Sequence, residues 1–306
     1  MVEFYNLDDI NIDSSTCVTI GNFDGVHLGH QRLIQKAVDY ARANNLKSVV
    51  FTFSNHPVNY FKPNTVKSII TEKEKRDIVE KLGVDIFISI PFDIRMTEIS
   101  AVEYIEKILI GRLNIKHIII GHDFNFARNR EGNGLLLKEV SKEYGFDVEI
   151  VEPILFNEKR VSSTDIRTFL SEGKVKEASE LLGRNYYIEG EVIHGRQIGR
   201  TIGFRTANVS LEKNSAIPGI GIYSGYVYVQ DKKYLGAISV GTNPTVNGRS
   251  LSLEVHIIDF NKDIYGEVIK IEFVDKLRDE INFSSLEELK KQLVIDVEDV
   301  RNQLNL

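Results

Sequence analysis

Cysteine is nearly absent from this sequence, which has only Cys17 among its 306 residues. A single cysteine excludes an internal disulfide framework and a cysteine metal cluster, and it agrees with a reducing compartment. Long hydrophobic runs are also missing: no stretch approaches the roughly 20 apolar residues that cross a bilayer, and the N-terminal segment lacks the basic and apolar parts of a signal peptide. We therefore expect a cytoplasmic protein without a membrane partner, in which Cys17 packs as a small hydrophobe.

The sequence also lacks an excess of positively charged residues. Lys and Arg together number 38 against 44 Asp and Glu, which gives a formal net charge of −6. Such a chain has no global attraction for nucleic acid, although a local basic pocket can still hold a small phosphate ligand. We expect small-molecule substrates and no nucleic-acid partner.

The first half of the chain alternates strand and helix patterns. Buried strands are predicted at 17–23, 48–53, 85–90, 117–120 and 147–151. Helical spacing follows the first strand, in the apolar series from Leu33 to Ala41, and recurs at 72–82 and 101–113. This alternation predicts a Rossmann-like α/β domain whose parallel sheet binds ligands beyond the carboxyl ends of its strands. The charge run 72–76 is interpreted as a solvated helix face.

The second half has a different pattern of predicted secondary structure. Short alternating strands are predicted at 187–193, 221–229, 234–240, 251–259 and 268–273, with turns at 231–233 and 247–248. This pattern predicts a small antiparallel β-barrel, and a final helix begins near Ser284 or Ser285, either of which is a suitable N-cap. A helical connector at 163–182 joins the halves. We expect two domains, 1–182 and 183–306.

The segment GNFDGVHLGHQ at 21–31 places His27 and His30 three residues apart where a strand turns into a helix. A helix start offers unpaired N–H groups and a dipole that favours anions, and glycines let a phosphate approach the backbone. Two arbitrary histidines are more often surface or core-satisfied groups. The strand-turn-helix context favours a phosphate site instead.

The segment SSTDIR at 162–167 opens a helix at the other end of the domain. Capping alone would explain Ser163 or Thr164. It does not explain Arg167, whose planar guanidinium suits a triphosphate and which lies one turn into the helix. Together with the two histidines, this segment predicts the second wall of a phosphate site.

A glycine-rich loop, HGRQIGRTIGF at 194–204, marks the second half. Gly195, Gly199 and Gly203 permit backbone donors to wrap a phosphate chain, and Thr206 and Asn208 follow directly. Glycine-rich hairpins are common in barrels, and the loop is not a Walker motif, so the loop alone leaves its function open.

These motifs resemble those of a known family. The histidine and arginine segments are similar to the HxGH and SSTxIR signatures of bacterial nucleotidyltransferases. With the flanking sequence included, nearly the whole chain resembles the bifunctional riboflavin kinase/FAD synthetase family. The segments that carry this resemblance are TIGNFDGVHLGHQ, GHDFNFARNREG, VSSTDIRTFL, HGRQIGRTIGF, GTNPTV, LEVHIIDF and LRDEINF.

For the first half, the resemblance implies adenylyl transfer from ATP to FMN, which gives FAD and pyrophosphate with Mg²⁺ as cofactor. Donors to the phosphates would be His27, His30, Ser163, Thr164 and Arg167. Four further matching positions, which would shape the flavin, nucleotide or metal environment, are Asn22, Asp24, His56 and Asp123. Structural alternatives stay open, since Asp24 would also brace a turn and His56 would stabilise a loop.

For the second half, the resemblance implies phosphorylation of riboflavin by ATP, which gives FMN. Glycines of the loop would bind ATP, while Thr206 and Asn208 would bind Mg²⁺ and phosphate. Glu254 would be the general base, and Arg278 would border the flavin or nucleotide pocket. Without the family context, Glu254 is an exposed strand residue and Arg278 forms a rim ion pair with Asp279 or Glu280.

Three positions depart from the family pattern. Asn125 and Ala127 stand where the family reads arginine and glycine, which removes a positive charge and strains Ala127 if the glycine has positive φ. Arg205 replaces a proline before Thr206 and either disturbs the metal ligands or adds a phosphate contact. These departures motivate one alternative, the loss of one of the two activities. Two further alternatives do not depend on them: an adenylyltransferase for another phosphorylated metabolite, and a flavin-sensing regulatory protein.

Overall fold

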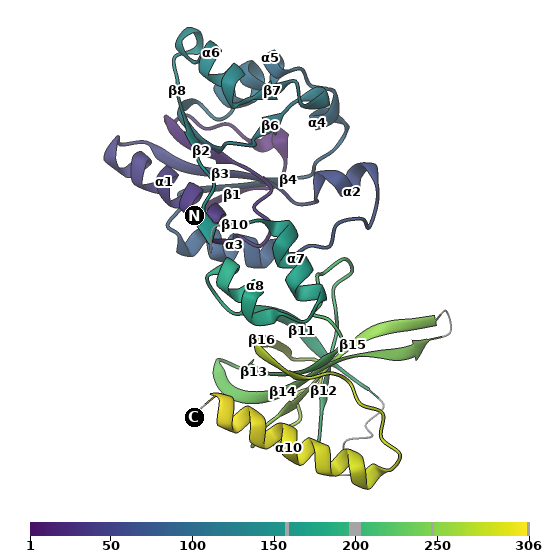
Figure 1. Cartoon of the computed structure of the whole chain (residues 1–306). Helices are drawn as coiled ribbons and strands as arrows, with labels where there is room; N and C mark the ends of the chain where they lie inside the picture. The colour runs from purple at the N-terminus through teal and green to yellow at the C-terminus, as the bar shows by residue number, and fades with distance from the viewer. Residues whose placement is uncertain (157–158, 196–202, 246–247, 305–306) are drawn as a thin grey trace. The chain divides into compact units, whose positions relative to one another are not determined.

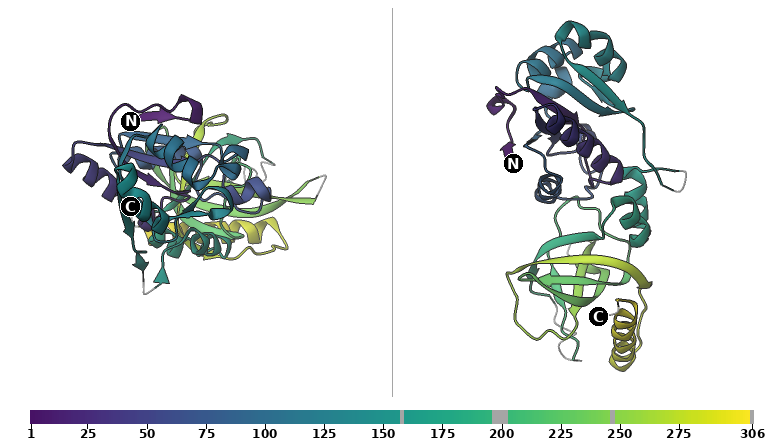
Figure 2. Two further views of the ribbon diagram at one scale, coloured as in Figure 1. Left: turned by 90° about the horizontal axis from the view of Figure 1, so that it is seen from above. Right: turned by 90° about the vertical axis from the view of Figure 1, so that its left-hand side faces the viewer.

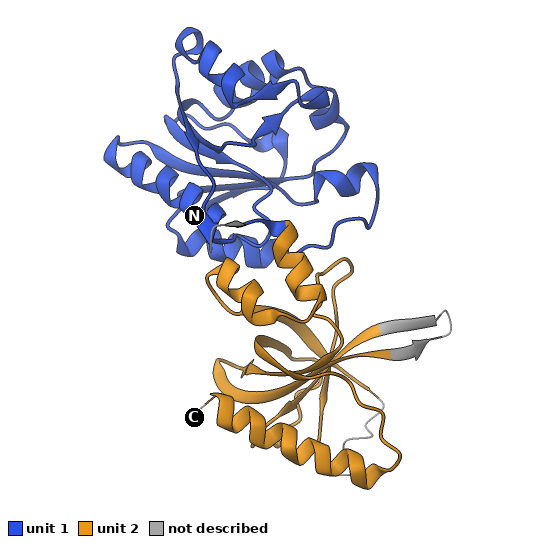
Figure 3. Cartoon of the chain, in the orientation of Figure 1, with its two compact units in different colours: residues 1–163 blue, residues 164–306 orange. Residues whose placement is uncertain are grey.

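The computed structural model describes residues 1–156, 159–195, 203–245 and 248–304. The chain forms two compact units, Met1–Ser163 and Thr164–Leu306 (Figure 3). The division falls at the start of helix α7 (Ser163–Ser171). Each unit is a separate body with its own core.

A six-stranded sheet forms the centre of the first unit, and all its pairs are parallel, as the sequence predicts. Its strands, in spatial order, are β1 (Val2–Phe4), β4 (Ile86–Ile90), β3 (Lys47–Phe53), β2 (Thr16–Ile20), β5 (Ile115–Gly121) and β8 (Asp147–Val151). Every residue of β2 and β4 is buried, because a parallel sheet is covered on both faces. The edge strand β1 was not predicted, because it has only three residues and none of them is fully buried.

Helices cover both faces of this sheet (Figure 1). Helix α1 packs Ala37 and Ala41 against Cys17 and Ile119 on one face, which confirms that Cys17 is a buried small hydrophobe. The opposite face is covered by residues of the segment that begins at Tyr104 and by residues of α6. The helices are α1 (Leu28–Ala43), α2 (Pro57–Phe61), α3 (Glu72–Lys81), α4 (Ile94–Glu98), α5 (Ala101–Glu103), the π-helix η2 (Tyr104–Ile110) and α6 (Gly134–Tyr144).

Short elements complete the first unit. These are the 3-10 helices η1 (Leu7–Asp9) and η3 (Arg128–Arg130), the hairpin of β6 (Asn125–Phe126) with β7 (Gly132–Asn133), and the hairpin of β9 (Leu155–Phe156) with β10 (Lys159–Arg160). Both hairpins follow strands at the carboxyl edge of the sheet, namely β5 and β8. They therefore belong to the edge at which a parallel sheet binds ligands.

The charged start of α3 is not the solvated face that the sequence indicated. Glu74 is only 3% exposed and Lys75 only 7% exposed. Glu74 completes a capping box, in which its carboxylate accepts from the N–H of Thr71 at 2.7 Å and the Thr71 hydroxyl accepts from the N–H of Glu74 at 3.1 Å. Lys75 is buried because its ammonium group reaches three oxygens of the sheet edge, described below.

The second unit begins with two helices and continues as a closed six-stranded barrel, in which every pair is antiparallel. The predicted antiparallel barrel is thus confirmed, and the strand β12 was not predicted. The helices are α7 and α8 (Val175–Leu182), and the strands, in spatial order, are β11 (Tyr186–Ile193), β12 (Ala207–Val209), β15 (Gly248–Ile257), β14 (Lys232–Thr245), β13 (Gly221–Val229) and β16 (Val268–Arg278).

The turn predicted at 231–233 is formed by residues 230 and 231. Gln230 and Asp231 have φ of 48° and 65°, and Val229 pairs directly with Lys232, so these two residues form the whole turn. The sequence missed this because Gln is not a usual turn residue. The other predicted turn includes Asn247, which lies outside the described residues.

The terminal helix α10 (Leu286–Leu304) lies along the outside of the barrel (Figure 2). The backbone N–H of Glu288 donates to the hydroxyl of Ser285 at 3.2 Å, which confirms Ser285 as the N-cap and the predicted start of this helix. Val300 and Leu304 pack against Leu235 and Ala237 of the barrel. No helix in the described part of the chain is long and apolar enough to cross a membrane.

Candidate active sites

The histidine motif and the Gly121–Phe124 segment leave the same edge of the first sheet. Strands β2 and β5 are parallel neighbours, and the two segments follow their carboxyl ends at Ile20 and Gly121. This is the location that the sequence predicts for a ligand site.

The turn between β2 and α1 has a strained backbone. Phe23, Gly25 and Val26 have φ of 46°, 82° and 38°, and such values in residues other than glycine are costly and concentrate at functional sites. Asp24 holds the turn, because its Oδ1 accepts from the N–H of Ile69 at 2.9 Å. Asp24 therefore has the bracing role considered as its structural alternative, and a direct role in binding stays a prediction.

His27 is the N-cap of α1 as well as a candidate phosphate ligand. Its Nδ1 accepts from the N–H of His30 at 3.3 Å, and the two imidazole rings stack with centroids 3.6 Å apart. A Cβ on Gly29 would lie 3.0 Å from the His27 ring, a tight contact that would require the ring to shift. In the described part of the chain no hydrogen bond is made by the N–H groups of Leu28 and Gly29, which suit an anion.

His30 is held in its neutral form. Burial lowers its pKa well below 6.5, and the charges of His27, Lys75 and Arg160 lower it further. Among the described residues its buried Nδ1 has no hydrogen-bond partner. An unpartnered buried imidazole nitrogen beside free N–H groups is typical of a ligand site.

The SST motif joins the same turn. Ser163 donates its hydroxyl to the carbonyl oxygen of Asp24 at 2.9 Å, although 139 residues separate the two in sequence. Thr164 and Arg167 follow on α7 and belong to the second unit, so their place beside the histidines stays a prediction.

Arg160 is a cation of the first site that the sequence analysis missed. Its guanidinium forms an ion pair with Asp123, beside His122. Burial raises the pKa of Asp123, but the hydrogen bond and charge of Arg160 outweigh it and bring this pKa below its ordinary value. Arg160 lies two residues before the SST motif, which begins at Ser162, yet nothing in the sequence pattern indicated which way it faces.

The other two predicted residues of the first site have local partners. Asn22 is exposed to solvent. Its backbone carbonyl oxygen accepts from the ammonium group of Lys75 and from the hydroxyl of Thr52, both at 3.0 Å. His56 caps α2, since its Nδ1 accepts from the N–H of Val58 at 3.2 Å. Roles of Asn22 and His56 in ligand binding stay predictions.

An aromatic cluster, consisting of Phe53, Tyr60, Phe61 and Phe92, lies at the same carboxyl edge and was also missed. Its ring centroids lie 5.2 to 6.2 Å apart, and Phe61 is 65% exposed. The Asn55 side chain fixes it by accepting from the N–H of Phe92 at 2.7 Å and donating to its carbonyl at 3.1 Å. The aromatic residues were visible in the sequence, but their convergence depends on the β3–β4 pairing.

The departure at Ala127 strains the chain as anticipated. Ala127 has φ of 64° and ψ of −178°, a conformation that is essentially restricted to glycine. Asn125, the second departure, donates its side-chain amide to the carbonyl of Asp123 at 2.7 Å. It supplies no positive charge.

The second unit brings together three of its predicted site residues. Strand β12 pairs with β15 so that Asn208 lies opposite Glu254, and the Thr206 hydroxyl donates to Glu254 Oε2 at 3.2 Å. Gly195 lies against Asn208, because a Cβ there would approach the amide to 2.2 Å. Gly203 has φ of 87°, and Gly199 lies outside the described residues.

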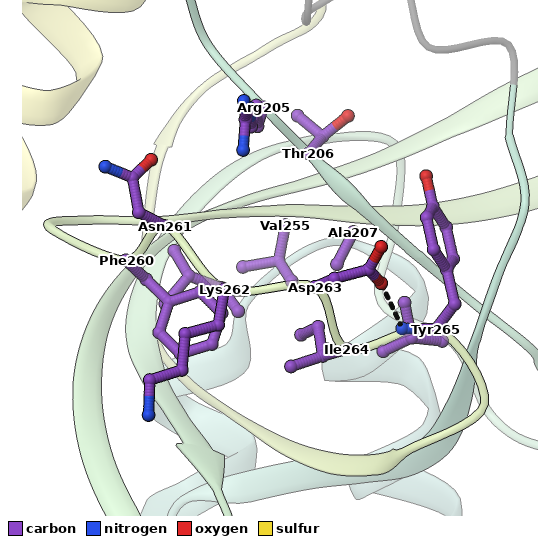
Figure 4. A pocket seen from close by; sticks show the side chains of 12 residues that line it. Arg205, Thr206, Ala207, Val255, Phe260, Asn261, Lys262, Asp263, Ile264 and Tyr265 are labelled. Atoms are coloured by element: carbon purple, nitrogen blue, oxygen red, sulfur yellow. Dashed lines mark hydrogen bonds between the residues drawn. The ribbon is translucent and has the colours of Figure 1, made fainter.

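A cavity of about 220 Å³ opens beside Thr206 (Figure 4). Two cations, Arg205 and Lys262, line it together with Asp263, Asn261, Tyr265 and apolar side chains. The backbone at Arg205 is held by His256, whose Nδ1 lies 2.8 Å from the Arg205 carbonyl. Since a carbonyl only accepts, this nitrogen carries a proton. The fixed conformation that proline would impose is thus replaced here by a hydrogen bond.

Arg278 makes a different ion pair from the one considered. Its guanidinium binds the buried carboxylate of Asp296 through two hydrogen bonds of 2.8 and 2.7 Å, and it donates to the Asp279 carbonyl at 3.0 Å. This pair fixes α10 to the end of β16. Contact with a flavin or nucleotide stays a prediction.

The described residues include no group of three or more histidine, cysteine, aspartate or glutamate side chains able to hold a metal ion. Thr206 and Asn208 instead offer neutral oxygens on either side of Ala207. Such a pair fits Mg²⁺ that takes its remaining ligands from substrate phosphates and water.

An anion site at a helix start in a parallel-sheet unit, together with a carboxylate beside metal-type oxygens in a barrel, defines a transferase with two phosphate-handling sites. The chain matches the FAD synthetase family over residues 9–165 and the riboflavin kinase family over residues 182–304. It belongs to the family of bifunctional riboflavin kinase/FMN adenylyltransferases, transferases whose two activities produce FMN and FAD.

Individual relatives agree with this membership. The bifunctional riboflavin kinase/FMN adenylyltransferase of Buchnera aphidicola subsp. Schizaphis graminum is 39% identical over 307 residues, covering 99% of this chain and 97% of the relative. That of Listeria monocytogenes is 36% identical and covers 94% and 92%. A crystal structure described as a macrolide-efflux protein from Streptococcus pneumoniae is 35% identical, with a TM-score of 0.90 and 98% coverage of both chains.

Proposed function

We propose that the first unit transfers the adenylyl group of ATP to FMN at the start of helix α1. The observation that carries this proposal is the stacked pair His27 and His30 beside the unpaired N–H groups of Leu28 and Gly29. The phosphate oxygen of FMN attacks the α-phosphorus of ATP, the bond to the bridging oxygen breaks, and pyrophosphate leaves. Charge builds on the phosphates during this step, so preorganised donors supply most of the rate enhancement.

Further groups serve the same transfer in this proposal. Ser163, Thr164 and Arg167 complete the donor set, and Arg160 adds a cation that already acts on His30. The aromatic cluster of Phe53, Tyr60, Phe61 and Phe92 offers exposed ring faces on which a flavin ring can stack. Asn22, Asp24, His56 and Asp123 shape the surroundings.

In the second unit, Glu254 takes the proton from the ribityl 5′-hydroxyl of riboflavin as this oxygen attacks the γ-phosphorus of ATP, the bond from the γ-phosphorus to its bridging oxygen breaks, and ADP leaves. The support is the position of Glu254 beside Thr206 and opposite Asn208. The cavity lined by Arg205 and Lys262 holds part of the nucleotide, with Gly195, Gly199 and Gly203 wrapping its phosphates. When bound at Thr206 and Asn208, Mg²⁺ neutralises charge on the phosphates.

The domain assignment is part of the proposal. Residues 1–182, including the helical connector, serve adenylyl transfer, and residues 183–306 serve the kinase reaction. The matches to the two families, at 9–165 and 182–304, support this assignment. The protein acts in the cytoplasm on riboflavin, FMN and ATP, without nucleic-acid or membrane partners.

The test is to incubate the purified chain with ATP and Mg²⁺, once with riboflavin and once with FMN, and to resolve the flavins by chromatography. We expect FMN and FAD from riboflavin, and FAD from FMN. His30→Asn should abolish FAD formation from FMN and leave FMN formation from riboflavin unchanged. Glu254→Gln should abolish FMN formation from riboflavin and leave FAD formation from supplied FMN unchanged, so each variant controls the other. A chain that forms no FAD from FMN would refute the first-unit proposal.

One alternative has a structural observation in its favour, namely weakened adenylyl transfer. The strain at Ala127 and the loss of positive charge at Asn125 both occur in the segment that follows Asp123. In that case the same incubation would accumulate FMN from riboflavin and convert it only slowly.

A further inference from the structure

Lys75 is a buried cation beneath the first site. It lies on α3, is 7% exposed, and directs its ammonium group at three oxygens. The Nζ atom donates to the carbonyl of Phe53 at 2.9 Å, to the carbonyl of Asn22 at 3.0 Å and to the hydroxyl of Thr52 at 3.3 Å. An ammonium group has three donors, so these bonds use all of them.

The three acceptors connect two strand ends. Asn22 follows β2 and begins the turn that leads to His27, whereas Thr52 and Phe53 end β3. Thr52 also donates its hydroxyl to the Asn22 carbonyl at 3.0 Å, so Lys75, Thr52 and Asn22 form a closed triangle of hydrogen bonds. This triangle fixes the first residues of the turn against the neighbouring strand.

The charge of Lys75 is only partly balanced. All three acceptors are neutral oxygens, and none of the ion pairs between described residues includes Lys75. Burial lowers the pKa of this lysine, while the charges of Asp24 and Glu72 raise it. Burial and the charge of His27 contribute most to the lowered pKa of His30, and the charge of Lys75 lowers this pKa further.

A purely structural reason for this lysine is weak. Burying a cation costs free energy that a methionine of similar length would not. A positive charge held under a turn is favourable where phosphates gather above it, because electrostatic interactions are stronger away from water.

We propose that Lys75 is a positioning residue for adenylyl transfer, which holds the Asn22 carbonyl at the end of β3 and keeps a buried positive charge under the ATP phosphates. The proposal rests on the proposed function of the first unit. Lys75 acts through the turn and does not touch substrate, since its donors are occupied.

The first experiment compares Lys75→Met with Lys73→Met in adenylyl transfer from ATP to FMN. Lys73 lies on the same helix, 62% exposed, and provides a matched loss of one charge. We expect Lys75→Met to lower kcat at least about tenfold, with KM for FMN within about twofold, because the charge acts on the phosphates during reaction. Lys73→Met should match the wild type, and riboflavin phosphorylation should be unchanged in both.

A second variant separates positioning from a loss of folding. Thr52→Val removes one corner of the triangle and keeps both the volume and the Lys75 charge, so kcat should fall less than in Lys75→Met. The double variant should lose less than the product of the two single effects, because both act through Asn22. Thermal unfolding of each variant shows whether the first unit is folded.

The possible outcomes are distinct. The proposal is overturned if the wild type is active and Lys75→Met has the same kcat for adenylyl transfer as Lys73→Met. If Lys75→Met does not fold, a folded Thr52→Val with wild-type kcat overturns it as well. A wild type that makes no FAD from FMN refutes the proposed function itself.

Discussion

The imidazole of His27 caps helix α1, since its Nδ1 accepts from the backbone N–H of His30 at 3.3 Å, and the same ring belongs to the proposed phosphate site. An Nδ1 that accepts carries no proton, which places the proton of the neutral ring on Nε2. The donor proposed for the phosphates is therefore defined by the cap.

The two roles of His27 can be separated by substitution. Asparagine is a strong N-cap, so His27→Asn should keep the stability of the first unit, whereas His27→Ala should cost about 1 kcal/mol. Both should lower kcat of adenylyl transfer about a hundredfold. Urea unfolding followed by circular dichroism, with kinetics on the same samples, measures both effects; wild-type kcat in His27→Asn would remove the residue from the proposed donors.

Ala127→Gly should stabilise the protein. The native φ of 64° with ψ of −178° strains alanine. Relief of this strain should exceed the entropic cost of glycine and leave a net gain of about 1 kcal/mol in the free energy of unfolding. Ala43→Gly in the exposed end of α1 is the control and should give no gain; equal effects of the two substitutions would contradict the strain.

His117 should make the first unit less stable at low pH. It stacks on Tyr40 with centroids 3.7 Å apart, and burial lowers its pKa below 6.5 more than Glu149 and Asp147 raise it. The unfolded chain then binds protons more readily, so stability present above pH 6.5 is lost as the pH falls.

His117→Phe tests this pH dependence. The substitution keeps an aromatic ring against Tyr40 and removes two nitrogens that have no hydrogen-bond partner among the described residues. Unfolding at pH 7.5, 6.5 and 5.5 should show a smaller decline than in the wild type. His30, whose pKa is lowered in the same direction, leaves a residual slope. An unchanged slope would exclude His117 as its source.

The Arg278–Asp296 pair should hold α10 to the barrel. Arg278→Ala leaves the buried Asp296 carboxylate without its partner and should cost about 3 kcal/mol in the stability of the second unit. The double variant Arg278→Met/Asp296→Leu should recover most of this loss. If Arg278 also borders the flavin, the double variant will be stable yet have a raised KM for riboflavin; a wild-type KM would assign the arginine to structure alone.

Arg205 should contribute to ATP binding in the kinase reaction. Its side chain and that of Lys262 line the cavity beside Thr206. Arg205→Ala and Lys262→Ala should each raise KM for ATP about tenfold, by the loss of a charge-assisted contact to phosphate. Lys213→Ala, an exposed residue outside the cavity, is the control, and equal KM values in all three would show that the cations are not used.

Local patterns were sufficient for much of this protein. Strand and helix alternation predicted the parallel sheet, short alternating strands predicted the barrel, and the GNFDGVHLGHQ segment placed His27 and His30 at a helix start, where the candidate anion site lies. The interactions that create these features lie within a few residues of one another, or repeat with a fixed period, so they can be read along the chain.

The tertiary structure alone decided the partners of the charged residues. Lys75 reads as surface because its neighbours in sequence are charged, but its acceptors lie 22 to 53 residues away on strand ends. Arg278 binds Asp296 instead of its sequence neighbours, and Ser163 reaches Asp24 across 139 residues. Burial of a charge depends on oxygens brought together by strand order, and no periodicity in the sequence records that order.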